Sequence, residues 1–566
     1  MSEARRFRTV ALVALLVLLA LGLARAAALA WVCDDSFISI RYAQNLLDGH
    51  GLVYNAGERV EGYTNLLWTL LLAALMHLGV APLAAAEVPG IVAYAALALC
   101  LAHWSWRQSR DGSRPFLPLA AGLVLISNDF HVWATGGLET MLFTALAVQA
   151  LVLTRFASRS TRLAWLAGGL FGLLVLTRPD GLLFAAAGAV SYWIPPGRFP
   201  PAARMRRSLA TLVPVLAVLV VLVPWKLAYY GDLLPTAFYS KSVLRPYYSQ
   251  GIIFVGVYLV KNWVLLVAGL LALAAFTTGR DETSPESRWH DRFFLGSCAL
   301  FTAYLVHVGG DFMFARRLLP AAPLLFLVIE NRVAGWPNPR ASLALAGLAL
   351  AAAALPLPLF DHWSRINGIG DERRFYPPES IEARRQQAEA VGRALAGSPA
   401  RVAFEGGMCV FGYYSGLPYL VEITGLTQYS LAKRPIAERG FIGHEKVADS
   451  DWLTENEIHF VVSQALPPVT RRPRTVGLDE IYFGDLAKAR IHIYSDDVMD
   501  ALRRLPDVDF VPIERVVELS RKRMERVSLA EAQRIYDELQ RFYFRTAGAR
   551  GETLKRELQA SLDRKR

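Results

Sequence analysis

Two adjacent carboxylic acids, Asp34 and Asp35, directly follow a long apolar run that ends near residue 30. Their like charges interact, so one of the two carboxyl groups is expected to keep a raised pKa where the pair is partly removed from water. A carboxylate in this state suits a general base that takes a proton from a reacting hydroxyl group. The rival use is binding of a hard divalent cation by the carboxylate oxygens. No second acidic cluster or histidine set near the pair supports that use, so the sequence predicts no metal and no other cofactor.

Further polar motifs stand at the ends of apolar runs along the chain. Ionisable groups near lipid are expensive to hold, so in such places they are functional candidates by default. The alternative is that single loop carboxylates are solvated or cap helices. The candidates for contact with a substrate are Glu61, Tyr63, Asp129, Glu139, Asp180 and Asp311, together with His444 in the tail, for which a plain surface loop is the alternative.

The composition identifies the kind of molecule that carries these residues. The chain has 566 residues, of which 54% are hydrophobic and 19% are charged, whereas a soluble protein carries about 25% charged residues. The apolar residues are gathered in long runs up to about residue 358, and the remainder reads as an ordinary globular sequence. This pattern predicts a polytopic α-helical membrane protein with a soluble domain. The net charge of +11 is attributed to arginine-rich cytoplasmic loops, so no nucleic-acid partner is expected.

Eleven apolar runs are candidates for transmembrane helices, each of which needs about 20 mainly apolar residues. The first is a helix and not a cleaved signal peptide, because it is too long and many spans follow it. A further stretch, 65–80, is assigned to the membrane interface, because the arginine-rich loops then stay in the cytoplasm. This topology puts the N-terminus inside, and it puts the polar motifs and the C-terminal region on the outer face. The predicted spans lie near 9–30, 84–106, 116–128, 139–154, 163–177, 181–195, 208–225, 251–277, 293–309, 318–331 and 341–358.

The elements that position the acids also leave a pattern in the sequence. Residues 37–47 carry apolar side chains at helical spacing, which predicts an amphipathic helix lying in the interface plane. We therefore expect a transmembrane domain over 1–358, with a first outer loop over 31–65, and a periplasmic α/β domain over 359–566 that could bind glycan. In that domain the expected strands are 401–404, 419–422 and 459–462, and the expected helices are 381–395 and 528–542.

Several of these motifs together resemble a known group of enzymes. The stretch 34–43, followed by 49–55 and 58–65, resembles the GT-C superfamily, whose members transfer sugars from polyprenyl-phosphate carriers on the outer membrane face. More specifically it resembles the terminal β-(1→2) arabinofuranosyltransferases of actinobacterial cell-wall arabinan. The resemblance covers most of residues 30–450. Its further motifs are Gly137–Thr140, Arg178–Gly181, Gly310–Met313, Gly425–Thr427 and His444–Lys446.

The resemblance implies a pentosyltransferase of the bacterial inner membrane. Its reaction would move D-arabinofuranose from decaprenyl-phosphoryl-arabinose to a cell-envelope glycan, with inversion and with Asp34 or Asp35 as the base. The donor phosphate needs cations, and guanidinium groups bind phosphate bidentately. Arg316 and Arg317 are the leading candidates, with anchoring to lipid headgroups as the alternative. Weaker candidates are Arg41, Arg178, Lys226, Lys241 and Arg245, and for Arg178 the alternative is a structural ion pair with Asp180 or another acid.

Other functions remain open from the sequence. The same scaffold handles other polyprenyl-phosphate sugars such as mannose, which would make the protein a hexosyltransferase, and a protein could be the acceptor. A lipid-linked-sugar transporter is the main alternative from another class, but transporters commonly show inverted repeats and midplane charges. The sequence shows no repeat, and its charged residues sit at the ends of apolar runs. The predicted partners are therefore a lipid-linked sugar donor, a glycan acceptor and the bilayer.

Overall fold

The computed structural model is divided by its contacts into two units. The first unit comprises Met1–Ser39, Tyr63–Leu233 and Ser242–Pro377, and the second comprises Ile40–Gly62, Leu234–Lys241 and Pro378–Arg566. Part of the predicted first outer loop is thus counted with the second unit. The structure describes residues 3–110, 114–157, 160–194, 200–265, 267, 285–336, 338–361, 363–405, 407, 409–436, 438–463, 476–544 and 548–566.

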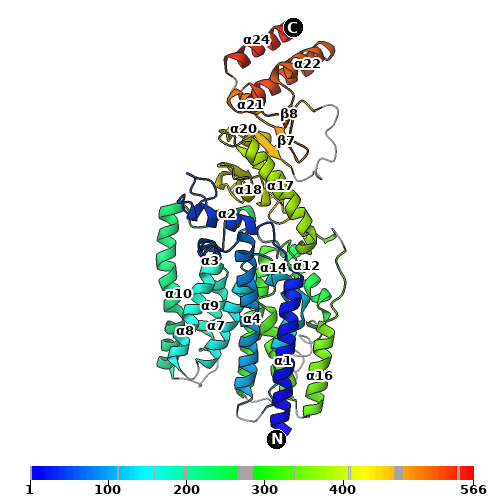
Figure 1. Ribbon diagram of the computed structural model, residues 1–566. Coiled ribbons are helices and arrows are strands. Elements are labelled where there is room, and N and C mark those ends of the chain that lie inside the picture. The colour runs from blue at the N-terminus through cyan, green and yellow to red at the C-terminus, as the bar shows by residue number, and fades with distance from the viewer. Residues whose placement is uncertain are drawn as a thin grey trace. The chain divides into compact units, whose positions relative to one another are not determined.

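The first unit is built from apolar helices that run side by side (Figure 1). Among the described residues, three helices are long and apolar enough to cross a membrane: α1 (Glu3–Ala28), α4 (Pro82–Gln108) and α10 (Pro201–Tyr230). Their most apolar segments have mean hydropathies of 2.5, 1.8 and 2.3, so the predicted membrane character is confirmed. Shorter apolar helices accompany them, and the count of eleven spans stays a prediction. These are α3 (Leu66–His77), α7 (Thr140–Phe156), α8 (Thr161–Thr177), α9 (Gly181–Val190) and α16 (Pro339–Ala353).

The remaining elements of the first unit connect these helices and end in a small hairpin. Strands β1 (Arg365–Ile366) and β2 (Ile369–Gly370) pair antiparallel and lead into the 3-10 helix η1 (Glu372–Phe375). Parts of the predicted spans 181–195 and 251–277 lie outside the described residues. The connecting helices are α5 (Leu119–Ile126), α6 (Asn128–Ala134), α12 (Tyr248–Lys261), α14 (Pro285–Val308) and α15 (Ala322–Ala334). The helix predicted over 37–47 is present as α2 (Ser36–Leu47), whose first residues belong to this unit, and its place in the membrane interface stays a prediction.

Small residues let the helices of the first unit approach closely, as is usual for helices that pack within a membrane. A Cβ atom at Gly168 of α8 would lie 2.6 Å from the carbonyl oxygen of Thr211 in α10. A Cβ atom at Gly90 of α4 would overlap the carbonyl oxygen of Ala134, at the end of α6. Substitution of either glycine would therefore push neighbouring helices apart.

The second unit is a mixed α/β structure, as the sequence predicts for the C-terminal region. Its six strands have the order β4-β3-β5-β7-β6-β8, in which β4, β3 and β5 are parallel and the other neighbours are antiparallel. The three predicted strands are confirmed as β3, β4 and β5. The strands are β3 (Val402–Phe404), β4 (Leu420–Glu422), β5 (Phe460–Val462), β6 (Glu480–Phe483), β7 (Ala487–Ile491) and β8 (Val508–Phe510).

Helices cover this sheet and extend beyond it. The predicted helices 381–395 and 528–542 are confirmed as α17 (Pro378–Ala394) and as α23 (Leu529–Glu538) with the π-helical turn η2 (Leu539–Tyr543). α17 packs on β6 and β7, and α22, α23 and α24 pack on one another. The other helices are α11 (Thr236–Ser240), α18 (Cys409–Tyr414), α19 (Tyr429–Ala432), α20 (Ser450–Glu455), α21 (Asp496–Leu502), α22 (Ile513–Arg526) and α24 (Ala549–Asp563).

Candidate functional site

The predicted acid pair lies in a tight turn between α1 and α2. Backbone hydrogen bonds close the turn, from Ser36 N to Cys33 O (3.0 Å) and from Phe37 N to Asp34 O (3.0 Å), and they lead directly into α2. The turn is attached to the loop between α6 and α7, because Cys33 N (3.0 Å) and Ser36 Oγ (3.2 Å) both donate to the carbonyl oxygen of Gly136. The backbone of both acids is therefore fixed at the start of α2.

The loop that receives this turn accommodates it because Gly136 is followed by a second glycine. Gly137 has a φ of +74°, a left-handed conformation that favours glycine. A Cβ atom at this position would lie 2.6 Å from Ser36 Oγ. The carbonyl oxygen of Gly137 accepts a hydrogen bond from Trp68 Nε1 (3.1 Å), which fixes the loop against α3. Glu139 follows in the same loop, so one short segment supports the acid pair and also carries a further predicted site residue.

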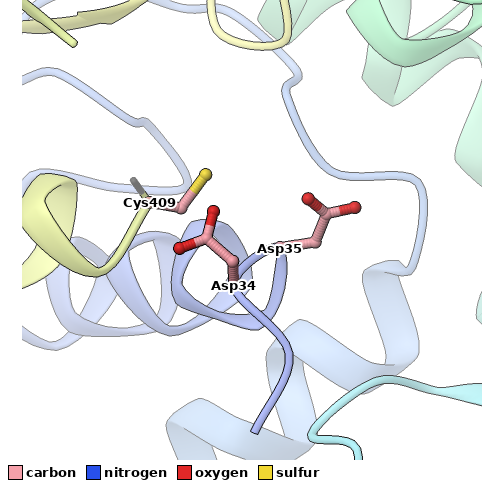
Figure 2. A group of neighbouring side chains, drawn as sticks. All are labelled: Asp34, Asp35 and Cys409. Carbon is pink, nitrogen blue, oxygen red and sulfur yellow. The ribbon is translucent and has the colours of Figure 1, made fainter. Parts of the chain in front are cut away.

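The two acids of the pair have different surroundings. Figure 2 shows that their carboxyl groups leave the turn in different directions. The Asp34 residue is only 1% exposed, whereas Asp35 is partly exposed. The sequence could not distinguish the two residues, but the structure gives Asp35 the better access to a group that arrives from solvent.

Glu139 is the centre of a buried ion network. Its carboxylate lies 3.2 Å from Arg316 Nη2 and 3.7 Å from Arg178 Nη1. Arg178 also donates to both carboxylate oxygens of Asp180, from Nε (3.0 Å) and from Nη2 (2.6 Å). The structural ion pair that was the alternative for Arg178 is therefore present. We call the following six residues the ion network: Glu139, Arg178, Asp180, Asp311, Arg316 and Arg317.

Longer contacts complete the ion network. Arg317 Nη2 lies 3.8 Å from Asp180 Oδ2, and Arg316 Nη1 lies 4.0 Å from Asp311 Oδ2. The members come from the α6–α7 loop, the α8–α9 turn and the segment between α14 and α15. The sequence predicts that these motifs converge, and the structure does bring them together. The roles assigned to the single residues stay predictions.

The charges of the ion network stabilise one another. Burial alone would raise the pKa of Glu139, but Arg316 and Arg178, with a hydrogen bond from Asn65, hold it below its usual value. Burial would likewise raise the pKa of Asp180, which Arg178 and Arg317 hold low. Burial would lower the pKa of Arg316, but Glu139 and Asp311 raise it above its usual value. These three groups are therefore charged at neutral pH.

The ion network contains three guanidinium groups and three carboxylates, so its formal charges cancel. A phosphate that binds here must share guanidinium groups with carboxylates already in place. Arg317 is best placed to do so, because its side chain is the most exposed of the three arginines at 19%, and its carboxylate neighbour Asp180 is as far away as 3.8 Å. Arg316 is 11% exposed and Arg178 is 5% exposed, which leaves them less accessible.

Asn65 joins the ion network to the helix that follows the acid pair, and sequence reasoning gave it no role. Its amide nitrogen donates to Glu139 Oε2 (2.9 Å), and its amide oxygen accepts from Ser39 Oγ of α2 (3.1 Å) and from Thr69 Oγ1 of α3 (3.2 Å). The only available signal was its place at the end of the motif 58–65. The acid pair and the ion network are thus connected through side chains as well as through the α6–α7 loop.

Two other predicted substrate contacts of the first unit have different described partners. Asp129 accepts from Lys261 Nζ (2.8 Å) and from Asn262 Nδ2 (2.9 Å), so it forms an ion pair between α6 and the end of α12. The Tyr63 and Tyr230 hydroxyl groups share a hydrogen bond of 2.9 Å. The described contacts of both residues are structural, and none of these contacts includes a member of the ion network.

In the second unit, Arg41 holds loops together. Its guanidinium group donates to three backbone carbonyl oxygens, those of Tyr54 (2.7 Å), Leu417 (2.8 Å) and Gly412. The residue is 7% exposed, and its ring contact with Tyr54 places the guanidinium carbon 4.7 Å from the ring centre. These hydrogen bonds use three of the five N–H donors of the guanidinium group, and the phosphate role of Arg41 stays a prediction.

The other predicted residues of the second unit lie in packed loops. The backbone carbonyl of Glu61 accepts from Thr236 N (2.9 Å), and the carbonyl of Lys241 accepts from Arg439 Nη1 (3.4 Å). The His444 ring stacks on Phe441 with ring centres 4.4 Å apart. These contacts describe how the loops are held and leave the predicted substrate roles untested.

The fold and the site together describe a helical membrane protein with a carboxylate pair and an arginine-rich ion network held by one loop. Two curated relatives, both named terminal beta-(1->2)-arabinofuranosyltransferase, match the sequence. The one from Mycobacterium tuberculosis (strain ATCC 25618 / H37Rv) is 30% identical over 407 residues, which cover 61% of this chain and 62% of the relative. The one from Corynebacterium glutamicum is 27% identical over 339 residues, which cover 54% of this chain and 48% of the relative. The predicted resemblance to these enzymes is confirmed, and the chain spans less than two thirds of their length.

No family model matches the chain. Among solved structures, ArnT from Cupriavidus metallidurans bound to undecaprenyl phosphate has a TM-score of 0.47 and 11% identity, covering 86% of this chain and 97% of that chain. The apo oligosaccharyltransferase of Archaeoglobus fulgidus has a TM-score of 0.46 and 10% identity, covering 79% of this chain and 69% of that chain.

Proposed function

We propose that the protein is a membrane glycosyltransferase that transfers D-arabinofuranose from decaprenyl-phosphoryl-arabinose to a cell-envelope glycan. The names of the two curated relatives support the sugar. The main structural support for the reaction type is the loop 136–139, which holds the carboxylate pair at one end and the centre of the ion network at the other. A base and a set of phosphate-binding cations are the two parts that this transfer needs.

In the proposed mechanism Asp35 is the base, because it is the more exposed residue of the pair. It takes the proton of the acceptor hydroxyl as that oxygen attacks the anomeric carbon. The bond from the anomeric carbon to the phosphate oxygen breaks at the same time, with inversion, and the leaving group is decaprenyl phosphate. Arg317, with Arg316 behind it, neutralises the charge on that phosphate. Asp34 positions the turn and the substrate.

The proposed topology puts this chemistry on the outer face of a bacterial inner membrane, with the N-terminus in the cytoplasm and residues 359–566 outside. It is supported by the positive-inside rule, which favours arginine-rich loops in the cytoplasm. Labelling of an Arg110→Cys variant with a membrane-impermeant maleimide tests it in intact cells. We expect no labelling of this position above the level of the unmodified protein, and strong labelling would contradict the topology.

The decisive experiment supplies the purified protein, in lipid nanodiscs, with radiolabelled decaprenyl-phosphoryl-arabinose and an oligoarabinoside acceptor. We expect a labelled product one sugar longer than the acceptor. Product from decaprenyl-phosphoryl-mannose and none from the arabinose donor would overturn the assignment of the sugar. Absence of product from either donor with sugar and peptide acceptors, despite binding of the donors, would contradict the proposed transferase activity.

A further inference from the structure

The first unit contains a buried carboxyl group that the proposed mechanism does not use. Glu372, the first residue of η1, is 1% exposed. Neither of its carboxylate oxygens has a hydrogen-bond partner among the described residues. Arg365 is its one described ion pair, with Nη1 3.2 Å from Glu372 Oε1. A buried carboxyl group without hydrogen bonds is costly to keep charged, so its presence here calls for a physical reason.

Two attachments hold η1 beside the proposed site. Gly370, just before it, pairs with the segment between α14 and α15, because Gly370 N donates to Phe312 O and Phe314 N donates to Gly370 O, both at 2.9 Å. On the other side, Arg373 Nε donates to the carbonyl oxygen of Leu29 (2.9 Å), shortly before the acid pair. Glu372 therefore lies between the segment of Asp311 and the turn that holds the acid pair.

The charges that face Glu372 come from each of these elements. The acid pair contributes Asp34 and Asp35, the segment after α14 contributes Asp311, and β1 contributes Arg365. The Cys33 thiol also faces it, and its own pKa is raised by burial, Asp35 and Glu372, so it adds no charge. Within η1 itself, Arg373 donates a hydrogen bond to the carbonyl oxygen of Leu29. Arg374 forms an ion pair with Asp371, with Nε 3.2 Å from Oδ2.

The balance of these charges favours the uncharged acid. Burial has the largest effect on Glu372, and together with Asp35, Asp311 and Asp34 it outweighs Arg365 and raises the pKa to about 8. At neutral pH the carboxyl group therefore carries its proton. The ion network next to it has no excess of positive charge, so an additional negative charge in this region would act directly against a bound phosphate.

We propose that Glu372 is a positioning residue that admits the phosphate of the donor only while its carboxyl group is protonated. Ionisation of Glu372 in alkaline solution places a fourth carboxylate beside Asp34, Asp35 and Asp311, and the phosphate is repelled. The proposal rests on the proposed function, because it assigns a condition under which the same site binds its lipid donor. At an effective dielectric constant near 20, one charge at roughly 10 Å changes a binding constant by about tenfold.

Binding of radiolabelled decaprenyl-phosphoryl-arabinose and decaprenyl-phosphoryl-mannose to the protein in nanodiscs, from pH 6 to pH 10, tests the proposal. Both lipids are phosphodiesters with one permanent charge, so the ligand itself does not titrate over this range. For the wild type we expect the dissociation constant to rise about tenfold between pH 7 and pH 9. Glu372→Gln should bind with the same affinity at both pH values, and Glu372→Asp should restore the rise.

Asp371→Asn is the matched control, since it removes a carboxylate from the neighbouring residue, which pairs with Arg374 instead. We expect this variant to keep the pH dependence of the wild type. Binding that is equally pH-dependent in the wild type and in Glu372→Gln would overturn the role of Glu372 and leave the proposed function in place. If neither lipid binds the wild type at any pH, the proposed function fails and the inference fails with it.

Discussion

Glu139 and Glu372 are buried to the same degree, at 1% exposure each, but their neighbours differ. Glu139 faces two guanidinium groups, at 3.2 and 3.7 Å, and its pKa is held below the usual value after burial is counted. Glu372 faces one guanidinium group, at 3.2 Å, and three other carboxyl groups, and its pKa is raised to about 8. Burial alone therefore does not decide the charge of an acid in this protein. The number of cations around the acid decides its charge. This number separates charged residues that hold the structure from residues that can exchange protons.

The largest effect is expected for the acid pair, to which the proposed mechanism assigns the proton transfer. Asp35→Asn should lower the transfer rate by about 10³-fold, within the range for loss of a general base, with little change in donor affinity. Asp34→Asn should lower it less, because this residue positions the turn. Single-turnover transfer measurements on both variants, with thermal unfolding as the folding control, check this order. A larger loss of transfer rate in Asp34→Asn than in Asp35→Asn would assign the role of general base to Asp34.

The second effect concerns structure. Glu139→Gln removes the carboxylate that the buried guanidinium groups of Arg178 and Arg316 share. This loss should lower the free energy of unfolding by about 3 kcal/mol. Because the folded-state pKa of Glu139 is depressed, its contribution is present above its unfolded pKa and is lost as the pH falls through the lower folded value. Thermal unfolding at pH 7 measures the loss.

Glu389→Gln is a suitable control for that measurement, since Glu389 forms partly exposed pairs with Arg385 and Arg393 on α17. It should change stability by about 0.5 kcal/mol or less. Equal melting temperatures for the two variants would show that the ion network is not a structural element.

Glu372 should show the opposite dependence on pH. The unfolded state releases this proton near the ordinary glutamate pKa of 4.5 and the folded state near 8, so the wild type loses stability as the pH rises between these values. Glu372→Gln does not undergo this loss of stability, so its stability relative to the wild type should be greater by about 4 kcal/mol at pH 9 than at pH 5. Thermal unfolding at the two pH values provides the measurement. A difference that is the same at both would contradict the raised pKa.

A smaller effect is expected where the ion network meets the donor. Arg317→Lys keeps the charge but loses the bidentate geometry, and it should raise KM for the donor about tenfold with little change in kcat. Arg340→Lys, at an exposed position at the start of α16, should leave both constants unchanged. Steady-state transfer kinetics with varied donor concentration separate the two constants. A fall in kcat alone would assign Arg317 to the reacting groups instead of to the donor phosphate.

The smallest effect is expected for His444. Its ring stacks on Phe441, and its Nδ1 lies 3.3 Å from the carbonyl oxygen of Ile442, as expected for loop packing. His444→Ala should then change transfer by about twofold or less. A rise of KM for the acceptor well beyond that would support the predicted substrate contact of His444.

The sequence predicted the fold best where a repeating pattern extends over many residues. The apolar runs of α1, α4 and α10 and the amphipathic pattern of α2 were sufficient to predict helices at these places. The strands at 401–404, 419–422 and 459–462 were also predicted correctly, because each is a buried run of apolar residues. The antiparallel strands β6, β7 and β8 were not predicted. They are only 4, 5 and 3 residues long, and β7 alternates buried residues with charged ones.

The sequence predicted the members of the ion network, but of their pairs it offered only the one between Arg178 and Asp180, as an alternative. Motifs at helix ends identified Glu139, Asp180 and Arg316 as candidates, because charged residues there are rare and stand out. Glu372 could not be found in this way. It lies among ordinary charged residues of a short connecting segment, and its burial depends on backbone pairing with a segment far away in the chain.

The α6–α7 loop has a consequence for how the protein tolerates change. Gly136 holds the turn of the acid pair, and Glu139 holds the arginines, with only two residues between them. Three residues of chain reach at most about 10 Å, so this stretch acts as a covalent spacer between the two halves of the proposed chemistry. Helices of the membrane domain can tilt or shift without changing that separation. Insertion or deletion of a single residue between 136 and 139, in contrast, would change it at once, even in a protein that folds and inserts normally.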